Sequence, residues 1–134
     1  MNGPLGKIIK SSKVIVKKGR YAYLKAEEKS LGNHFLIAQD DGEITVITEE
    51  KNVAKTQHKE EVKWFKLIEV GVSKPFVAKG FLAAITKAIS EKGLNVLVVS
   101  TFSKDYLLVR EETNDAAVKA LREIGFKVKL EKQV

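Results

Sequence analysis

Two short segments of the chain carry residue types that could recognise a small charged molecule. Residues 71–76 precede a stretch of helical periodicity, so their backbone N–H groups would point toward a helix N-terminus, where a carboxylate binds favourably. The second segment, residues 100–105, is rich in polar groups. Ser100 and Thr101 offer hydroxyls, and Asp105 offers a counter-charge for an ammonium group. The two segments together describe a pocket for a zwitterion.

The same residues also have a purely structural interpretation. Ser73 could cap the helix that follows it, and Asp105 could stabilise a turn. Gly71 would then serve only the conformation of the loop. From these residues alone, a binding pocket and ordinary capping both remain open.

The sequence lacks the common motifs of catalytic sites. The sequence has no glycine-rich phosphate loop, nucleophile elbow or metalloprotease helix motif. It has no Cys, which excludes disulfides, thiolate nucleophiles and zinc–thiolate sites. Its two histidines, His34 and His58, are far apart in sequence, and its adjacent acids would diverge on a strand or turn. We therefore expect no catalytic residues, no metal and no cofactor, and a protein that is not an enzyme.

Length and charge bound the remaining possibilities. The 134 residues suffice for one domain or two very small ones, and 44% hydrophobic with 31% charged residues is a globular composition. The net charge is +7, of which residues 1–20 supply +6, and the abundance of Lys and Glu resembles thermophile proteins. The basic N-terminus could contact nucleic acid or anionic lipid, but it lacks interleaved aromatic residues.

No apolar run approaches the 18 or more residues of a membrane-spanning helix. The basic N-terminus is also not followed by the apolar core of a secretory signal. We expect a cytoplasmic protein that does not enter the membrane.

The first half of the chain predicts short strands. Alternating apolar residues indicate strands near residues 14–16 and 21–24, and residues 35–39 and 44–47 indicate a hairpin. The Asp40-Asp41-Gly42 turn between the hairpin strands suggests a glycine with positive φ, because Asp-Gly sequences favour that conformation in tight turns. A short helix is expected around Val53.

The second half has a clearer order. A strand at residues 62–70 is followed by a helix at 76–92, whose apolar face consists of Val77, Phe81, Ile85, Ala88 and Ile89. Residues 94–102 form a nearly continuous apolar strand, which we expect to be central and covered. A return strand, a helix at 115–124 capped by Thr113 or Asn114, and a last strand alternating Phe126, Val128 and Leu130 complete the pattern.

This order, βαββαβ, predicts an α+β ferredoxin-like module with an antiparallel sheet and both helices on one face. In that fold the first strand–helix loop and the end of the second strand lie at the same end of neighbouring strands. The first half resembles a reduced copy at an offset of 62 residues, with Leu36 on Val98. We therefore expect a basic flexible arm at residues 1–13, a degenerate module at 14–61 and a complete module at 62–134.

Residues 100–126, STFSKDYLLVREETNDAAVKALREIGF, resemble the ACT domain family, in particular small tandem-ACT proteins related to cytosolic arginine sensors. Gly71, Phe76 and Gly80 fit the loop and helix of that family. The hairpin at residues 35–50 fits its first, degenerate module more loosely. The resemblance covers about 60 residues closely and implies an amino-acid-binding, allosteric regulatory module without catalytic activity.

The resemblance implies specific ligand-binding residues. Thr101, Phe102 and Asp105 match the ligand segment of the arginine sensors, and Val72, Ser73 and Lys74 occupy the ligand-contacting loop. The sensors carry acids where this chain has Val77 and Ala78, so a smaller or more neutral amino acid is at least as plausible as arginine.

The resemblance also implies partners. We expect a homodimer, because ACT sheets commonly pair and edge strands need covering. Regulation would act on a separate protein. The alternatives are a nucleic-acid-binding module using the sheet and the basic arm, or an ACT remnant that mediates only protein–protein contacts.

Overall fold

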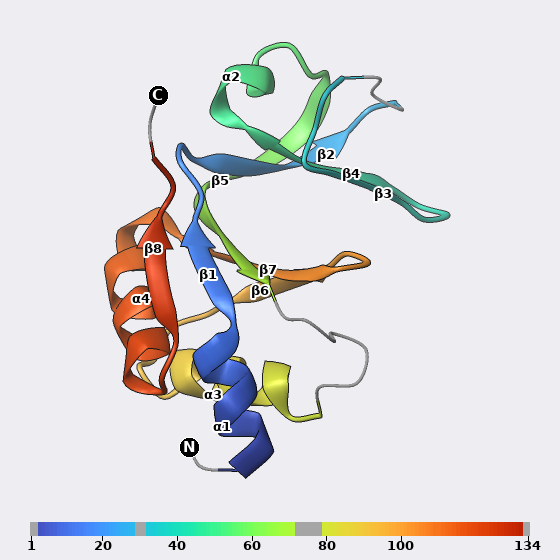
Figure 1. Ribbon diagram of the computed structural model, residues 1–134. Helices are drawn as coiled ribbons and strands as arrows, with labels where there is room; N and C mark the ends of the chain where they lie inside the picture. The colour runs from blue at the N-terminus through green and yellow to red at the C-terminus, as the bar shows by residue number, and fades with distance from the viewer. Residues whose placement is uncertain (1–2, 29–31, 72–78, 133–134) are drawn as a thin grey trace. The chain divides into compact units, whose positions relative to one another are not determined.

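The computed structural model describes residues 3–28, 32–71 and 79–132 (Figure 1). Its chain forms two compact units. The larger unit combines residues 1–18 with 66–134, and the smaller unit consists of residues 19–65. One long strand, β5 (His58–Gly71), contributes residues to both. The first strand of the chain therefore belongs with the C-terminal half, whereas we had expected it in a separate N-terminal module.

The larger unit contains the predicted βαββαβ order. It runs from the end of β5 through α3 (Phe81–Ser90), β6 (Leu97–Ser100), β7 (Lys104–Arg110) and α4 (Asn114–Glu123) to β8 (Lys127–Leu130). Within this unit the strand order is β6-β7-β5-β1-β8, because β1 (Lys13–Val16) inserts between β5 and β8. β1 is antiparallel to β5 but parallel to β8. The sequence did not predict this insertion or the parallel pair.

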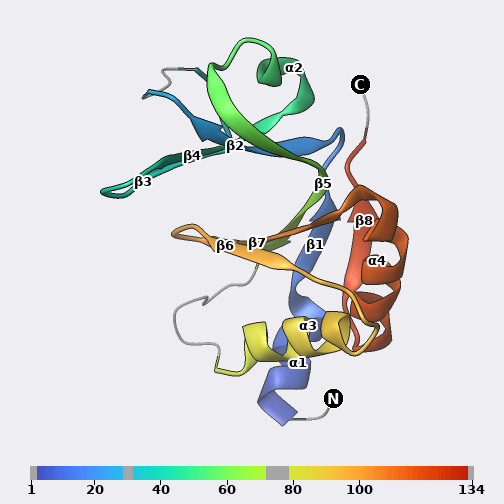
Figure 2. The same ribbon diagram turned by 180° about the vertical axis from the view of Figure 1, so that it is seen from behind.

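One face of this sheet carries the hydrophobic core. Alternating residues of the strands, including Ile68, Val70, Leu107 and Val109, pack against buried residues of α3 and α4. Figure 2 shows α3 and α4 from behind. The rings of Phe81 and Phe126 meet edge to face at 5.7 Å between centroids. The expectation that both helices cover one face of the sheet is confirmed.

The predicted flexible arm is wrong for the described residues. Residues Gly3–Ser11 form helix α1, and Ile9 is only 1% exposed. Leu5 and Ile8 also pack against the core of the larger unit. The Lys-rich composition concealed an amphipathic helix, whose apolar side is buried while its lysines face solvent.

Helix α3 begins later than predicted. Residues 76–78 lie outside the described residues, but Lys79 and Gly80 form a turn, and Gly80 has a φ of +78°. A left-handed residue cannot continue an α-helix, so the helix starts at Phe81. Phe81, Ile85 and Ile89 are buried as expected, whereas Ala88 is only half-buried.

Strand β6 is not the central, covered strand that we expected. It pairs only with β7 among the described strands, and Leu97 and Val98 are 38% and 37% exposed. An apolar run alone cannot distinguish a buried central strand from an exposed edge strand. The covered strands are β7 and β5, where Leu107, Leu108 and Ile68 are almost fully buried.

The ends of α4 also depart from expectation. The residue before the helix, Thr113, makes no side-chain capping bond, and its hydroxyl instead donates to the carbonyl of Arg110. Asn114 lies within the helix, with a buried Oδ1 that has no hydrogen-bond partner. After α4 and Gly125, Phe126 and Val128 are buried, but Leu130 is 70% exposed. The alternation of apolar residues in the sequence therefore continues beyond the end of the hydrophobic core.

The smaller unit is a four-stranded sheet with one short helix. Its order is β3-β4-β2-β5, with β2 (Tyr21–Ala26), β3 (Leu36–Gln39) and β4 (Ile44–Glu49) all antiparallel to their neighbours. The predicted short helix is α2 (Glu50–Val53). Ala22, Leu24 and Val46 are at the centre of its core.

The hairpin turn of the smaller unit uses an aspartate rather than a left-handed glycine. Gly42 is not among the glycines with positive φ. Instead the Oδ1 atom of Asp40 accepts hydrogen bonds from the backbone N–H groups of Gly42 and Glu43, at 2.8 and 2.9 Å. This Asx geometry supports a four-residue turn without left-handed backbone.

The two hairpins correspond at an offset of 61, not 62, residues. β3 and β6 begin at Leu36 and Leu97, and β4 and β7 end at Glu49 and Arg110. The last pairs before the turns are Gln39 with Ile44 and Ser100 with Asp105. Burial follows the same offset, since residues 46–48 and 107–109 are all buried. The alignment from sequence differs by one residue because it superimposed the Asp-Gly turn on the Ser-Lys turn. The strand registers align the paired residues of the two hairpins instead.

No helix in the described part of the chain is both long and apolar enough to cross a bilayer.

Candidate functional site

The predicted polar segment lies where β6 turns into β7. Ser100 and Asp105 are the last pair of this hairpin, directly opposite each other. The Ser100 hydroxyl donates to Oδ1 of Asp105 at 2.6 Å. Asp105 is only 5% exposed, whereas Ser100 is exposed. The structure therefore brings these two predicted residues together, with the carboxylate on the inner side and the hydroxyl at the rim.

Asp105 faces the helices. It alternates with Leu107 and Val109, which lie in the core between the sheet and α3 and α4. A carboxylate in this position lies at the end of an apolar layer, where an ionised group requires hydrogen-bond donors. Ser100 supplies one donor, and a carboxylate can accept several.

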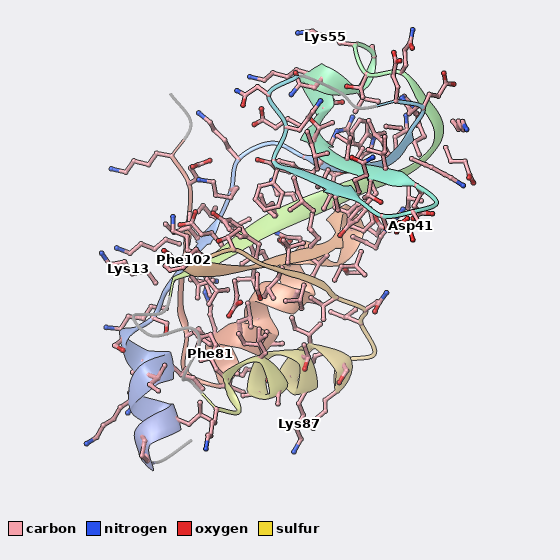
Figure 3. All side chains as sticks on the ribbon, turned by 90° about the vertical axis from the view of Figure 1, so that its right-hand side faces the viewer. Lys13, Asp41, Lys55, Phe81, Lys87 and Phe102 are labelled. Atoms are coloured by element: carbon pink, nitrogen blue, oxygen red, sulfur yellow. The ribbon has the colours of Figure 1, made fainter. Side chains whose placement is uncertain are left out.

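Thr101 and Phe102 occupy the turn. The N–H of Thr101 donates to the carbonyl of Lys104 at 2.8 Å, and its hydroxyl donates to the same oxygen at 3.2 Å. Phe102 is 83% exposed, and Figure 3 labels it at the hairpin tip. Thr101 is thus committed to the turn as a donor, whereas the Phe102 ring is accessible to a ligand or partner.

The predicted loop residues Val72, Ser73 and Lys74 lie outside the described residues. The strand that leads into this loop ends at Gly71. Just before that end, the Oε1 atom of Glu69 lies 3.5 Å from Nζ of Lys104 and 3.3 Å from the hydroxyl of Tyr106. These contacts place the end of β5 beside the start of β7, and hence beside Asp105.

Sequence reasoning missed the charged network around Glu69. Besides Lys104 and Tyr106, Glu69 lies 3.9 Å from Nζ of Lys17, which also binds Glu131. The hydrogen bond to Glu131 raises the pKa of Lys17, and burial together with Glu69 raises the pKa of Tyr106. The available signal was an acid inside the apolar run of residues 62–70.

This network lies on the sheet face opposite the helices, since Lys104 and Tyr106 alternate with Asp105. It links β1, β5, β7 and the C-terminal segment within the larger unit. Its groups are paired with one another, so its most direct effect is to fix the register of strands that carry the Ser100–Asp105 pair. Among the described residues, no three His, Asp or Glu side chains are arranged to hold a metal ion.

Residues 60–123 match the family model of the ACT domain. This match extends from β5 to α4 and includes the hairpin that carries Ser100 and Asp105. A search of the curated proteins finds no match.

Solved structures share the fold over nearly the whole chain. A protein from Agobacterium tumefaciens superposes with a TM-score of 0.74 at 20% identity, covering 91% of this chain and 95% of that chain. A protein of unknown function from Vibrio cholerae gives 0.75 at 21% identity, covering 90% and 95%. The regulatory subunit of aspartate kinase from Thermus flavus gives 0.60 at 10% identity, covering 87% and 98%.

These similarities establish the architecture. The chain has an α+β fold with helices packed on a multi-stranded sheet, as in the ferredoxin-like modules of ACT regulatory domains.

Proposed function

We propose that this protein is a regulatory module that binds a free amino acid reversibly at the end of the sheet formed by β5, β6 and β7. The observation that carries the proposal is the buried Asp105 carboxylate, held by Ser100 beside the strand end from which the predicted ligand loop departs. The ACT match and the likeness to an aspartate kinase regulatory subunit support a regulatory role.

The site divides into two parts with opposite preferences. Asp105 attracts the ammonium group of an amino acid, and Ser100 orients the carboxylate that receives it. Backbone N–H groups of the loop containing Val72 and Ser73 would hold the ligand carboxylate, with Lys74 adding positive charge. Phe102 would cover an apolar side chain.

We propose a small or neutral amino acid rather than arginine. An arginine side chain requires an acidic partner for its guanidinium group. The segment expected to provide that partner has Val77 and Ala78 instead. The resemblance to the arginine sensors therefore extends to the mode of binding and not to the ligand.

The smaller unit is proposed to be a reduced ACT-like module. The support is the correspondence of hairpins and burial at an offset of 61 residues. At the position equivalent to Asp105, however, this unit has Ile44. We therefore expect the smaller unit not to bind an amino acid in the same way.

Regulation would act on a second copy or on a separate partner protein. A ligand changes such an association only by binding one packing arrangement more tightly than another. Among the described strands of the larger unit, β6 and β8 are at the sheet edges, and such edges favour pairing between copies. Light scattering with and without the ligand tests whether the protein is a homodimer.

The experiment is a thermal-shift screen of the full chain against the twenty amino acids at millimolar concentration. A ligand at a hundredfold excess over its Kd stabilises the folded state by about 2.7 kcal/mol. Asp105→Asn keeps the shape and the acceptor for Ser100 but removes the charge, so we expect the shift to disappear. Asp41→Asn makes the same charge change at an exposed turn and should preserve it.

The proposal is overturned if no amino acid raises the melting temperature of a protein that melts cooperatively. It is also overturned if both asparagine variants respond like the unmodified protein.

A further inference from the structure

A basic groove lies in the larger unit, apart from the Ser100–Asp105 site. It has a volume of about 480 Å³ and is formed where α1 leads into β1 and where β8 runs alongside. Its lining includes four lysines, Lys10, Lys13, Lys127 and Lys129. Figure 3 labels Lys13 at the surface of this unit.

The fold forces these lysines together. Lys13 lies opposite Lys127 in the parallel β1–β8 pair, and Lys129 is two residues further along the same face. Neighbouring strands are about 4.8 Å apart, and residues two apart on a strand are separated by about 6.6 Å. Like charges at these separations repel one another, so their grouping costs folding free energy unless an anion compensates.

The described residues supply no compensating acid at this end of the strands. No acidic residue lines the groove, and none of the four lysines forms an ion pair with a described residue. The other end of the same face differs, because Nζ of Lys17 pairs with Glu131, which also accepts from the backbone N–H of Lys18 at 2.9 Å. Glu131 is therefore already engaged.

The lining also indicates the type of anion. Lysines are compact point charges that suit phosphate oxygens. The hydroxyls of Ser11 and Ser12 already donate to the carbonyl of Ile8, at 3.1 and 2.6 Å, so the lysines supply the attraction for an anion. The rest of the described lining is Val14 and Ile15, and none of the described lining residues is an aromatic on which a base could stack. A surface of this kind recognises concentrated negative charge and does not read bases.

We propose that this groove binds a short chain of phosphates, either free or as the tail of a nucleoside triphosphate. Four ammonium groups from α1, β1 and β8 would surround the phosphate chain. The groove and the Ser100–Asp105 site share no residue, so binding at each can be tested with its own variants.

The test is isothermal titration calorimetry of the full chain with sodium tripolyphosphate at low ionic strength. The variant pair Lys13→Gln and Lys127→Gln, made together, should weaken binding by about tenfold or more, because two charge-assisted contacts are lost. Lys87→Gln with Lys119→Gln removes the same charge from exposed positions of α3 and α4 and should leave the affinity within about twofold.

Two further titrations distinguish the source of the phosphates. Equal affinity for ATP and tripolyphosphate supports a free phosphate chain as the ligand, and markedly tighter ATP binding supports a nucleoside triphosphate. Preferential binding of a uridine oligonucleotide, with an affinity that grows with its length, would overturn the proposal in favour of a nucleic-acid interface.

Absence of tripolyphosphate binding, or an equal loss in the groove and control variants, would also overturn the proposal. The groove variants should retain any melting-temperature shift produced by an amino acid, so failure of this inference leaves the amino-acid site untouched.

Discussion

The imidazole of His58 lies between two acceptors of the smaller unit. Its Nδ1 atom is 2.6 Å from the carbonyl oxygen of Thr56, and its Nε2 atom is 2.9 Å from Oε1 of Glu61. Both partners can only accept, so both ring nitrogens donate when the ring is protonated. The hydrogen bond to Glu61, reinforced by the one to Thr56, raises the pKa of His58 above 6.5.

This arrangement predicts a pH-dependent stability. A raised folded-state pKa means that the full stabilisation is present below the unfolded value of about 6.5 and is lost as pH rises through the folded value. Urea unfolding between pH 5.5 and 8.5 should therefore show a decrease that His58→Gln removes. The effect should be small because the pair lies at the surface. A His58→Gln slope equal to that of the unmodified protein would contradict this assignment.

At the same scale, individual residues differed in how well their roles could be predicted. The Ser100–Asp105 pair was placed in one segment from residue type alone, and the structure shows the hydrogen bond between them. Asp40 was read as part of a glycine turn although its side chain makes the turn. Glu69 was not recognised, because its partners come from strands far away in sequence.

Among the elements, α1 departs most from expectation, because residues predicted to be a flexible arm form a helix that packs on the core. Ile9 is 1% exposed in the core of the larger unit. Ile9→Ala should destabilise the protein by about 2–5 kcal/mol, as expected for a buried branched side chain. Ile37→Ala, at a 41% exposed position of β3, should cost less than about 1 kcal/mol.

Chemical unfolding of both variants measures this difference. Equal and small losses would mean that residues 3–11 do not pack in solution, and would restore the flexible arm.

The start of α3 depends on a left-handed glycine. Gly80 has a φ of +78°, and a Cβ there would meet, among the described residues, only Leu5 Cδ2 at 3.6 Å, so the cost of a side chain is in the backbone. Gly80→Ala should destabilise by about 1–2 kcal/mol. Gly42→Ala, where φ is not positive, should change stability by less than about 0.5 kcal/mol.

Thermal unfolding compares the two alanine variants directly. A Gly80→Ala protein as stable as Gly42→Ala would show that the residue before α3 does not need the left-handed conformation.

The positions of helices and strands were easier to predict from the sequence than which of them are buried or exposed. The periodicity of residues 76–92 and 115–124 indicated both major helices, because each buries one continuous apolar face. The exposure of β6 and of Leu130 could not be read from apolar patterns, since those patterns do not say which strand is at an edge. The lysines of residues 1–13 indicated a fully solvated segment. Helix α1 instead packs Leu5, Ile8 and Ile9 against the core of the larger unit.

For the whole molecule, the βαββαβ order followed from the sequence, but the insertion of β1 between β5 and β8 did not. That pairing joins residues more than a hundred positions apart, and no local signal specifies it. The insertion of β1 brings together the lysines of the basic groove and the Lys17–Glu131 pair. The sequence pattern aligned the two hairpins at an offset of 62 residues, and their strand registers align them at 61.

An amino acid bound beside Asp105, as proposed, would change the environment of the neighbouring backbone amides of the larger unit. The most direct measurement is a series of ¹H–¹⁵N correlation spectra of the full chain during titration with the amino acid that gives the largest thermal shift. We expect saturable changes at the amides of residues 100–105 and little change at the corresponding turn of residues 40–43. Changes confined to the smaller unit, or none near Asp105, would contradict the proposal.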